Sequence, residues 1–178
     1  DLGAGLFTAL GIVSALHHRH QSGEGIAVDV AMLDSQLALL ENAIARYYSA
    51  GTSPKPLGAR HPSIAPFEAY RTKDSYVVIA CGNDSLFRTF CGVVRHATLA
   101  DDPRFATNAK RSAHVVELKE TLETFLTENT TDYWLELFNR TGIPSAPINT
   151  VEQAIHDPQV QHRQIVLPVD DPSVAPLE

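Results

Sequence analysis

The first residue of the sequence is an aspartate that stands directly before a run of small residues. Asp1 precedes Gly3, Ala4 and Gly5, and this stretch predicts the first turn of a helix. Backbone N–H groups in a first helical turn have no partner within the helix, and the helix dipole favours negative charge there. Such an environment keeps the Asp1 carboxylate ionised and could stabilise an oxyanion formed beside it. An aspartate here is also a common helix N-cap, and residue type alone favours that simpler role.

A second group of polar residues lies in the proline-rich segment 51–66. Arg60, His61 and Ser63 stand close together within it. A guanidinium or a protonated imidazole can hold a carboxylate through charge-assisted hydrogen bonds. The segment therefore predicts an extended linker or an active-site loop, and a rigid proline turn whose charges are solvated accounts for these residues equally well.

Two other clusters favour structural roles over metal binding. His17, His18 and His20 are polar, but adjacent histidines point to different faces of a helix, and cations are stabilised at a helix C-terminus. Cys81 and Cys91 lack the paired spacing of a zinc site. We therefore expect no bound metal ion.

The overall composition is that of an ordinary globular protein. The 178 residues are 44% hydrophobic and 20% charged, which is enough apolar material to repay the entropy of folding. The net charge of −7 argues against binding to nucleic acid. No apolar run approaches the roughly 20 residues of a membrane span, and no signal peptide is apparent, so we expect no membrane partner. Two cysteines without a disulfide framework indicate a reducing compartment, the cytoplasm or the mitochondrial matrix of a eukaryote.

Helices and strands alternate along the sequence around these two candidate sites. The predicted elements are helices over residues 4–20, 33–49, 84–94, 115–126 and 131–141, strands over 26–30 and 76–80, and polar loops over 51–66 and 101–111. Asn83 and Thr150 predict helix N-caps, Gly142 before Pro144 predicts a helix end, and Trp134 and Phe138, one turn apart, predict core positions. This order is typical of an α/β protein with a break near residues 50–65. The sequence lacks an initiator methionine and ends within a loop, so we expect a piece of a longer protein.

Three ordered stretches carry a resemblance to a known family. The first comprises Asp1-x-x-x-Gly5, Ser22-Gly23-x-Gly25, Val28-Asp29-Val30 and Met32-Leu33-Asp34-Ser35. The second comprises Arg60-His61-Pro62-Ser63-Ile64-Ala65-Pro66-Phe67, Tyr70 and Cys81-Gly82-Asn83-Asp84. The third comprises Asp101-Asp102-Pro103-Arg104-Phe105, Asn108, Arg111, Trp134, Gly142-Ile143-Pro144 and Asp157-Pro158. Together they resemble the class III CoA-transferases, the family of formyl-CoA transferase and carnitine CoA-transferase.

The resemblance implies a particular fold. A large nucleotide-fold domain, built from both chain ends, would carry an inserted smaller α/β domain, and two subunits would interlock as a homodimer. Residues 1–50 would belong to the large CoA-binding domain and 51–66 would form the linker or active-site loop. Residues 67–150 would form the small domain, and 151–178 would return toward the large domain. The sequence would thus begin at the catalytic aspartate.

The resemblance also implies a reaction. The Asp1 carboxylate would attack an acyl-CoA thioester to form a mixed anhydride, and the CoA thiolate would return to form an aspartyl-CoA thioester. An incoming small carboxylic acid would then reverse these steps. A CoA thioester would be the substrate, with no permanently bound cofactor. The implied site residues are Asp1 as the catalyst, Gly3, Ala4 and Gly5 as backbone donors, and Arg60, His61 and Ser63 as substrate ligands.

Two departures from family patterns narrow the expectation. The formyl-CoA branch has a run of glycines where this sequence has His61-Pro62-Ser63-Ile64, which favours larger acids such as dicarboxylic acids or carnitine-type acids over formate and oxalate. Racemases of 2-methylacyl-CoA esters place a glutamate where this sequence has Gly82-Asn83-Asp84, which is closer to the transferases. A racemase remains one alternative. Another is that the isolated fragment is an inactive module used only for dimerisation.

Overall fold

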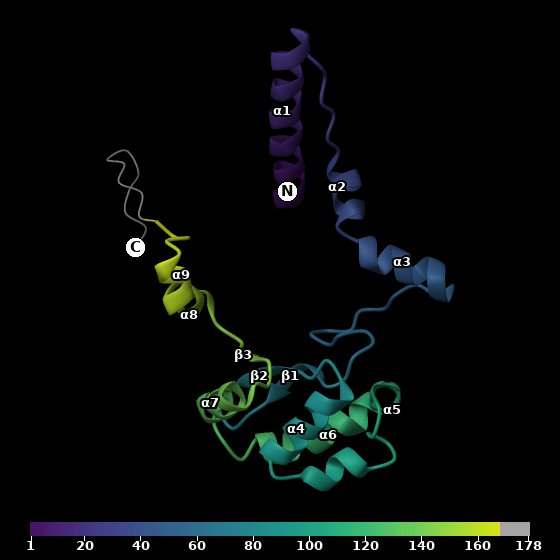
Figure 1. Ribbon diagram of the computed structural model, residues 1–178, viewed down its shortest axis with the longest axis vertical. Helices are drawn as coiled ribbons and strands as arrows, with labels where there is room; N and C mark the ends of the chain where they lie inside the picture. The colour runs from purple at the N-terminus through teal and green to yellow at the C-terminus, as the bar shows by residue number, and fades with distance from the viewer. Residues whose placement is uncertain (168–178) are drawn as a thin grey trace. The chain divides into compact units, whose positions relative to one another are not determined.

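The computed structural model describes residues 1–167 and consists of two compact units, Asp1–Pro56 and Leu57–Glu178 (Figure 1). The first unit contains α1 (Leu2–Ser22), α2 (Met32–Ala38) and α3 (Glu41–Ala50). The second unit contains β1 (Phe67–Arg71), β2 (Tyr76–Ala80), α4 (Asp84–Val93), the 3-10 helix η1 (Ala97–Asp101), α5 (Asn108–Ala113), α6 (Val115–Leu126), α7 (Thr131–Thr141), β3 (Ser145–Pro147), α8 (Val151–Ile155) and α9 (Pro158–His162). The division falls inside segment 51–66, which contains neither helix nor strand.

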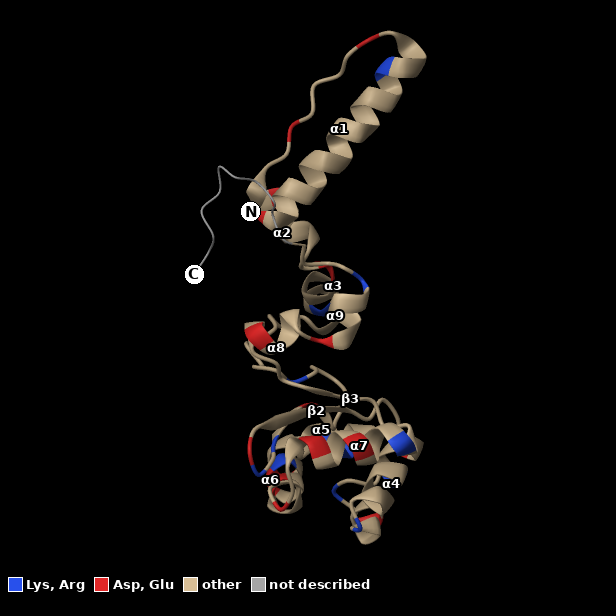
Figure 2. Cartoon of the chain, turned by 90° about the vertical axis from the view of Figure 1, so that its left-hand side faces the viewer, with Lys and Arg blue, Asp and Glu red and all other residues tan. Residues whose placement is uncertain are grey.

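Helix α1 begins and ends where local signals predict. Asp1 is its N-cap, and Gly23 ends it in the left-handed conformation at φ 76°, with its N–H bonded to the Arg19 carbonyl. Arg19 is the one Lys, Arg, Asp or Glu residue in α1, so the helix is almost free of charge (Figure 2). Among residues 1–167, no helix combines the length and the apolar character needed to cross a bilayer.

The strand predicted over residues 26–30 is wrong. The segment between α1 and α2 is extended, but it pairs with no strand in the first unit and instead runs back along α1 (Figure 1). Gly11 makes this contact possible, because a Cβ atom at Gly11 would lie 2.6 Å from Val28 Cγ1. The alternating valines of this segment therefore pack on a helix and not in a sheet.

The helix predicted over residues 33–49 is interrupted. Helix α2 ends at Ala38, and α3 begins at Glu41. At the junction, the Leu40 N–H bonds to the Leu37 carbonyl, which is the tighter spacing of a 3-10 turn. The apolar periodicity continues through this turn, so periodicity alone could not reveal the break.

A three-stranded antiparallel sheet, in the order β1-β2-β3, organises the second unit. Tyr70 pairs with Val77, and Val78 pairs with Ala146. Alternate residues of β1 and β2 are buried, so one face of each strand points into the core. Helix α6 packs against β1, and α7 packs against β2 and β3. Helices α4 to α7 lie on one side of the sheet (Figures 1 and 2).

The core of the second unit is rich in aromatic residues. Trp134 and Phe138, one turn apart on α7, are both buried, as their spacing predicts, and their rings stack 5.6 Å apart. The Trp134 indole N–H donates to the Leu126 carbonyl at 2.7 Å. Every large buried hydrophobic residue in the described chain belongs to this unit. The second unit therefore has its own hydrophobic core.

Several local predictions are confirmed and one is corrected. The predicted helix starts at Asn83 and at Thr150 are true caps, and Gly142 ends α7 at φ 72°. Residues 101–111 are not one loop, because η1 extends to Asp101 and α5 begins at Asn108. That helix start matters for the site described below.

Candidate active site

The Asp1 carboxylate is exposed at the N-terminus of α1. Asp1 occupies the N-cap position, yet its side chain makes no capping hydrogen bond. Its carbonyl oxygen accepts the first helical bond, from the Gly5 N–H at 2.8 Å. The carboxylate is therefore available for chemistry and is not used to cap the helix.

The three small residues Gly3, Ala4 and Gly5 differ in whether their backbone N–H groups already have a partner. The Gly5 N–H is engaged in the first helical bond, so the expectation of a free donor at Gly5 is not met in this structure. Gly3 and Ala4 precede that bond, and their N–H groups have no partner four residues back within the helix. A Cβ atom at Gly3 would lie 2.9 Å from Leu39 Cδ1, so glycine lets the first turn of α1 approach the end of α2.

His61 organises the proline-rich loop of the second unit. Its Nδ1 accepts hydrogen bonds from the backbone N–H groups of Ser63, at 3.2 Å, and Ile64, at 3.1 Å. The imidazole stacks on the Phe67 ring with 5.0 Å between ring centroids. The backbone N–H of His61 donates to the Phe67 carbonyl at 2.8 Å. Because Nδ1 accepts, the ring proton lies on Nε2, which is then the one nitrogen able to donate to a ligand.

Arg60 lines a pocket of about 270 Å³ beside α6. Lys119 in the same pocket is already bound to Glu68, at 2.6 Å, and to the Ala69 carbonyl. Among the described residues, Arg60 forms no salt bridge. Arg60 is therefore the cation of this pocket without a salt bridge among the described residues, and Glu120 and Glu123 also line the pocket.

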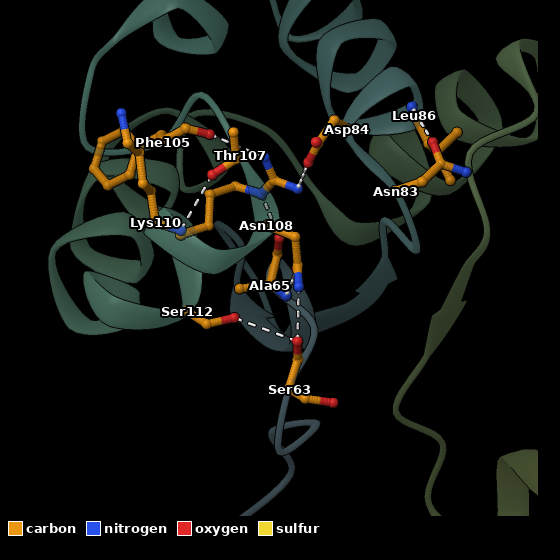
Figure 3. Close-up of polar contacts among 11 residues, drawn as sticks. Ser63, Ala65, Asn83, Asp84, Leu86, Phe105, Thr107, Asn108, Lys110 and Ser112 are labelled. Carbon is orange, nitrogen blue, oxygen red and sulfur yellow. Dashed lines mark hydrogen bonds and ion pairs between the residues drawn. The ribbon is translucent and has the colours of Figure 1, made fainter.

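Helix α5 holds the backbone of the loop from the other side (Figure 3). Asn108 Oδ1 accepts from the Ala65 N–H at 3.1 Å, and Asn108 Nδ2 donates to the Ser63 carbonyl at 2.8 Å. Arg111, one turn later on α5, donates from Nε to the Ala65 carbonyl at 2.5 Å. Asn108 and Arg111 belong to the third stretch of family resemblance, but their positions in the sequence indicate no role for them. Their spacing of three, which puts both on one helix face, is the signal that could have linked them.

Arg111 is fully buried, and each part of its guanidinium has a partner. Nη1 donates to the Phe105 carbonyl at 2.9 Å, and Nη2 donates to the Asp84 carboxylate at 2.7 Å. The guanidinium also lies over the Phe87 ring, 4.4 Å from its centroid. The hydrogen bond from Arg111 lowers the pKa of Asp84, which therefore stays ionised and is a poor general acid.

The cysteines and acidic clusters give no second reactive centre. Cys81 and Cys91 are free and buried, and burial raises the pKa of both thiols to about 12. Hydrogen bonds from Arg104 hold the pKa of Asp102 at about 2. Within residues 1–167, no three His, Cys, Asp or Glu side chains are grouped to hold a metal ion.

The structure thus groups the predicted site residues in two sets. Asp1, Gly3 and Ala4 lie together at the start of α1 in the first unit. Arg60, His61 and Ser63 lie together in the loop that opens the second unit. The first set offers a free carboxylate, and the second offers donors for a carboxylate.

Comparisons with a family model, with related sequences and with solved structures all indicate the same family. The model of CoA-transferase family III matches residues 1–178. The chain is 38% identical over 167 residues to an acetyl-CoA:oxalate CoA-transferase of Acetobacter aceti, and 37% identical over 178 residues to a succinate–glutarate CoA-transferase of Agrobacterium fabrum. A crystal structure of a CAIB/BAIF family protein from Brucella suis matches with a TM-score of 0.79 at 37% identity, over 90% of this chain and 43% of that one.

This chain belongs to CoA-transferase family III. Its mixed helix and strand architecture is that of the family, as expected. The alignments cover 94% and 99% of this chain but 43% and 44% of the two relatives, so it spans less than half of their length. Those relatives are named for two different acids, oxalate and glutarate, so the likeness does not by itself select an acid.

Proposed function

We propose that the full-length protein is an acyl-CoA:carboxylate CoA-transferase in which Asp1 is the nucleophile. The observation that carries this proposal is the Asp1 carboxylate, exposed and uncapped at the start of a family III chain. The nearby N–H groups of Gly3 and Ala4 and the positive end of the α1 dipole favour its ionised form. They would also stabilise negative charge developing on a thioester carbonyl oxygen.

The proposed reaction proceeds by four acyl transfers that balance without a cofactor. An Asp1 oxygen attacks the acyl-CoA carbonyl carbon, the C–S bond breaks, and CoA leaves as a thiolate. The thiolate attacks the Asp1 carbonyl carbon of the resulting anhydride, so the first acid leaves as a carboxylate and an aspartyl-CoA thioester remains. The acceptor carboxylate expels CoA again to form a second anhydride. Thiolate attack on the acceptor carbonyl then yields the new CoA ester and restores Asp1.

The same proposal assigns acid selection to the loop. Arg60 is an unpaired cation within the described chain, and His61 Nε2 is a hydrogen-bond donor. A guanidinium holds a carboxylate in a bidentate pair, so Arg60 suits the second carboxylate of a dicarboxylic acid. Dicarboxylic acids and their CoA esters are the proposed substrates, with Ser63 as a further contact.

Replacing Asp1 tests the nucleophile. We expect Asp1→Asn and Asp1→Ala in the full-length protein to lower CoA transfer by at least about a thousandfold, because no carboxylate remains to carry the acyl group. CoA esters are followed by mass spectrometry after mixing succinyl-CoA with glutarate. Hydroxylamine added after succinyl-CoA should modify the Asp1 peptide of the wild type only.

Asp132→Asn is the matched control, because Asp132 is an exposed carboxylate in the first turn of α7. It should leave transfer unchanged. An Asp1→Ala variant that transfers CoA at the wild-type rate would refute the assignment of the nucleophile.

The racemase alternative is disfavoured by the residues after β2. Asn83 caps α4 by accepting from the Leu86 N–H at 2.8 Å, and Asp84 is held by Arg111. Neither is free to move a proton at a substrate carbon. A racemase would incorporate deuterium from heavy water into a 2-methylacyl-CoA ester without any acceptor acid, whereas the proposed transferase would not.

A homodimer is part of the proposal, because the resemblance to the class III CoA-transferases implies one. If the chain served only for dimerisation, the full-length protein would associate but leave CoA esters unchanged. The transfer assay therefore separates the two functions.

A further inference from the structure

The backbone of residues 61–65 is held by hydrogen bonds from both sides. From within the loop, His61 Nδ1 accepts the N–H groups of Ser63 and Ile64. From α5, Asn108 accepts the Ala65 N–H and donates to the Ser63 carbonyl. Successive peptide groups therefore have fixed partners, and a loop that contains two prolines within residues 62–66 has little freedom left.

Asn108 and Arg111 make different contributions to this arrangement. Arg111 is fully buried and joins the loop to the N-terminus of α4, so it is part of the core. Asn108 is only partly buried, and its side-chain hydrogen bonds go to the loop. A change at Asn108 should therefore act on the loop and leave the core intact.

The Asn108 bonds bear directly on where Arg60 and His61 are held. Ser63 is two residues from His61, and its carbonyl accepts from Asn108 Nδ2 while its N–H donates to His61 Nδ1. Without the Asn108 bond, the Ser63 carbonyl would keep only the longer bond from Ser112 Oγ, at 3.4 Å, and the acceptor geometry of the imidazole would loosen. A donor that moves away from its ideal distance and angle forms a weaker bond to a bound carboxylate.

We propose that Asn108 is a positioning residue that sets the affinity of the loop for dicarboxylic acids by fixing the Ser63–Ala65 backbone. This inference rests on the proposed function, because it takes the loop as the ligand of the second carboxylate. Asn108 touches no substrate and acts through Arg60 and His61. Its removal should therefore weaken the binding of the acid and spare the chemical steps at Asp1.

The test compares two variants of Asn108 in the full-length protein. Asn108→Ala removes both bonds to the loop. Asn108→Asp keeps the acceptor for the Ala65 N–H but replaces the donor to the Ser63 carbonyl with a second acceptor, which repels that carbonyl. Lys110→Ala is the control, because Lys110 is exposed on the same helix, and its side chain forms no hydrogen bond or ion pair with a described residue.

Transfer from succinyl-CoA to glutarate is measured as kcat and KM for glutarate. We expect both Asn108 variants to raise this KM about tenfold while kcat stays within about twofold of the wild type. Lys110→Ala should change neither. Amide hydrogen exchange supplies a second readout: the Ala65 amide should exchange faster in Asn108→Ala and should stay protected in Asn108→Asp.

The outcomes separate the two claims. A wild-type protein that transfers no CoA overturns the proposed function and this inference with it. If the wild type transfers CoA but Asn108→Ala leaves the glutarate KM unchanged, or lowers kcat alone, the inference is wrong and the proposed function stands. An equal rise in KM for Lys110→Ala also overturns the inference. If Asn108→Ala does not fold, Asn108→Asp decides by the same criteria.

Discussion

Arg111 holds a positive charge where no solvent reaches it. A buried guanidinium is tolerated only when its donors are satisfied and its charge is balanced. Two backbone carbonyls and the Asp84 carboxylate provide this balance, and the Phe87 ring lies against the guanidinium plane. Asp84 itself is about half exposed, with 53% of its side chain accessible, so solvent weakens the pair.

Replacement of Asp84 should destabilise the protein in a pH-dependent way. Arg111 lowers the folded-state pKa of Asp84, so the stabilisation is present above the ordinary aspartate pKa and is lost as the pH falls through the folded-state value. Asp84→Asn should therefore lower the free energy of unfolding by about 1 kcal/mol at pH 7. Urea unfolding of both proteins at pH 7 and near pH 3 measures the difference, which should shrink at low pH.

Glu120→Gln serves as the control, since Glu120 is exposed in the middle of α6, away from both helix ends, and its side chain forms no hydrogen bond or ion pair with a described residue. It should show no such convergence. A difference between wild type and Asp84→Asn that grows toward low pH would contradict the role given to the Arg111 pair.

At the scale of elements, α1 and the segment that follows it are joined by a contact between a glycine and a valine. Gly11 lies in the middle of a helix, where alanine would be more favourable by about 1 kcal/mol. The close approach of Val28 explains why glycine is there, because a Cβ atom would meet Val28 Cγ1 at 2.6 Å. The cost of Gly11 in helix propensity is thus offset by packing.

A double-mutant cycle measures this balance. Gly11→Ala alone should destabilise the full-length protein by about 1 kcal/mol, because overpacking outweighs the gain in helix propensity. In a Val28→Ala background the same change should stabilise by about 1 kcal/mol. Thermal unfolding of the four proteins gives the two values. If Gly11→Ala stabilises equally in both backgrounds, Val28 does not constrain α1.

Which elements could be predicted from sequence depends on how local their causes are. Helix caps such as Asn83 and Thr150 act over three residues and were predicted. Strand β2 is a continuous apolar run and was also predicted. Strand β1 includes Glu68 and Arg71, and β3 has only three residues, so both depend on pairing with β2 and were missed. The segment around Val28 has a strand pattern but no partner strand among residues 1–167.

The residues of the candidate site also differ in whether local sequence patterns predict their positions. Asp1 could be placed at a helix start because small residues follow it. Arg60 and His61 could be placed in a loop because prolines surround them. The bonds from Asn108 and Arg111 to that loop cross more than 40 residues, and no local pattern reports such a contact.

At the scale of the whole molecule, the two units differ in how they are stabilised. Ser35 is the one buried residue of the first unit, whereas the second unit has a complete aromatic and aliphatic core. Leu6, Leu10 and Val13 are each more than 60% exposed on α1. Contiguous apolar surface of this kind marks an interface, and it is prone to aggregation when nothing covers it.

The 178-residue chain by itself should therefore self-associate. We expect light scattering to give a mass above that of one chain, and a hydrophobic dye to bind strongly. Leu6→Lys combined with Leu10→Lys should reduce both signals. Val116→Lys is the control, because Val116 is equally exposed but lies on α6 of the second unit. A single-chain species that binds no dye would contradict this prediction.

The reactivity of the two buried cysteines should report when the second unit unfolds. Cys81 and Cys91 both lie in the core of the second unit, and neither is exposed or readily ionised. A thiol reagent can reach them only in molecules whose sheet and helices have separated. The rate of this reaction therefore measures how often the second unit opens. Unfolding that is confined to α1, α2 and α3 does not change the rate.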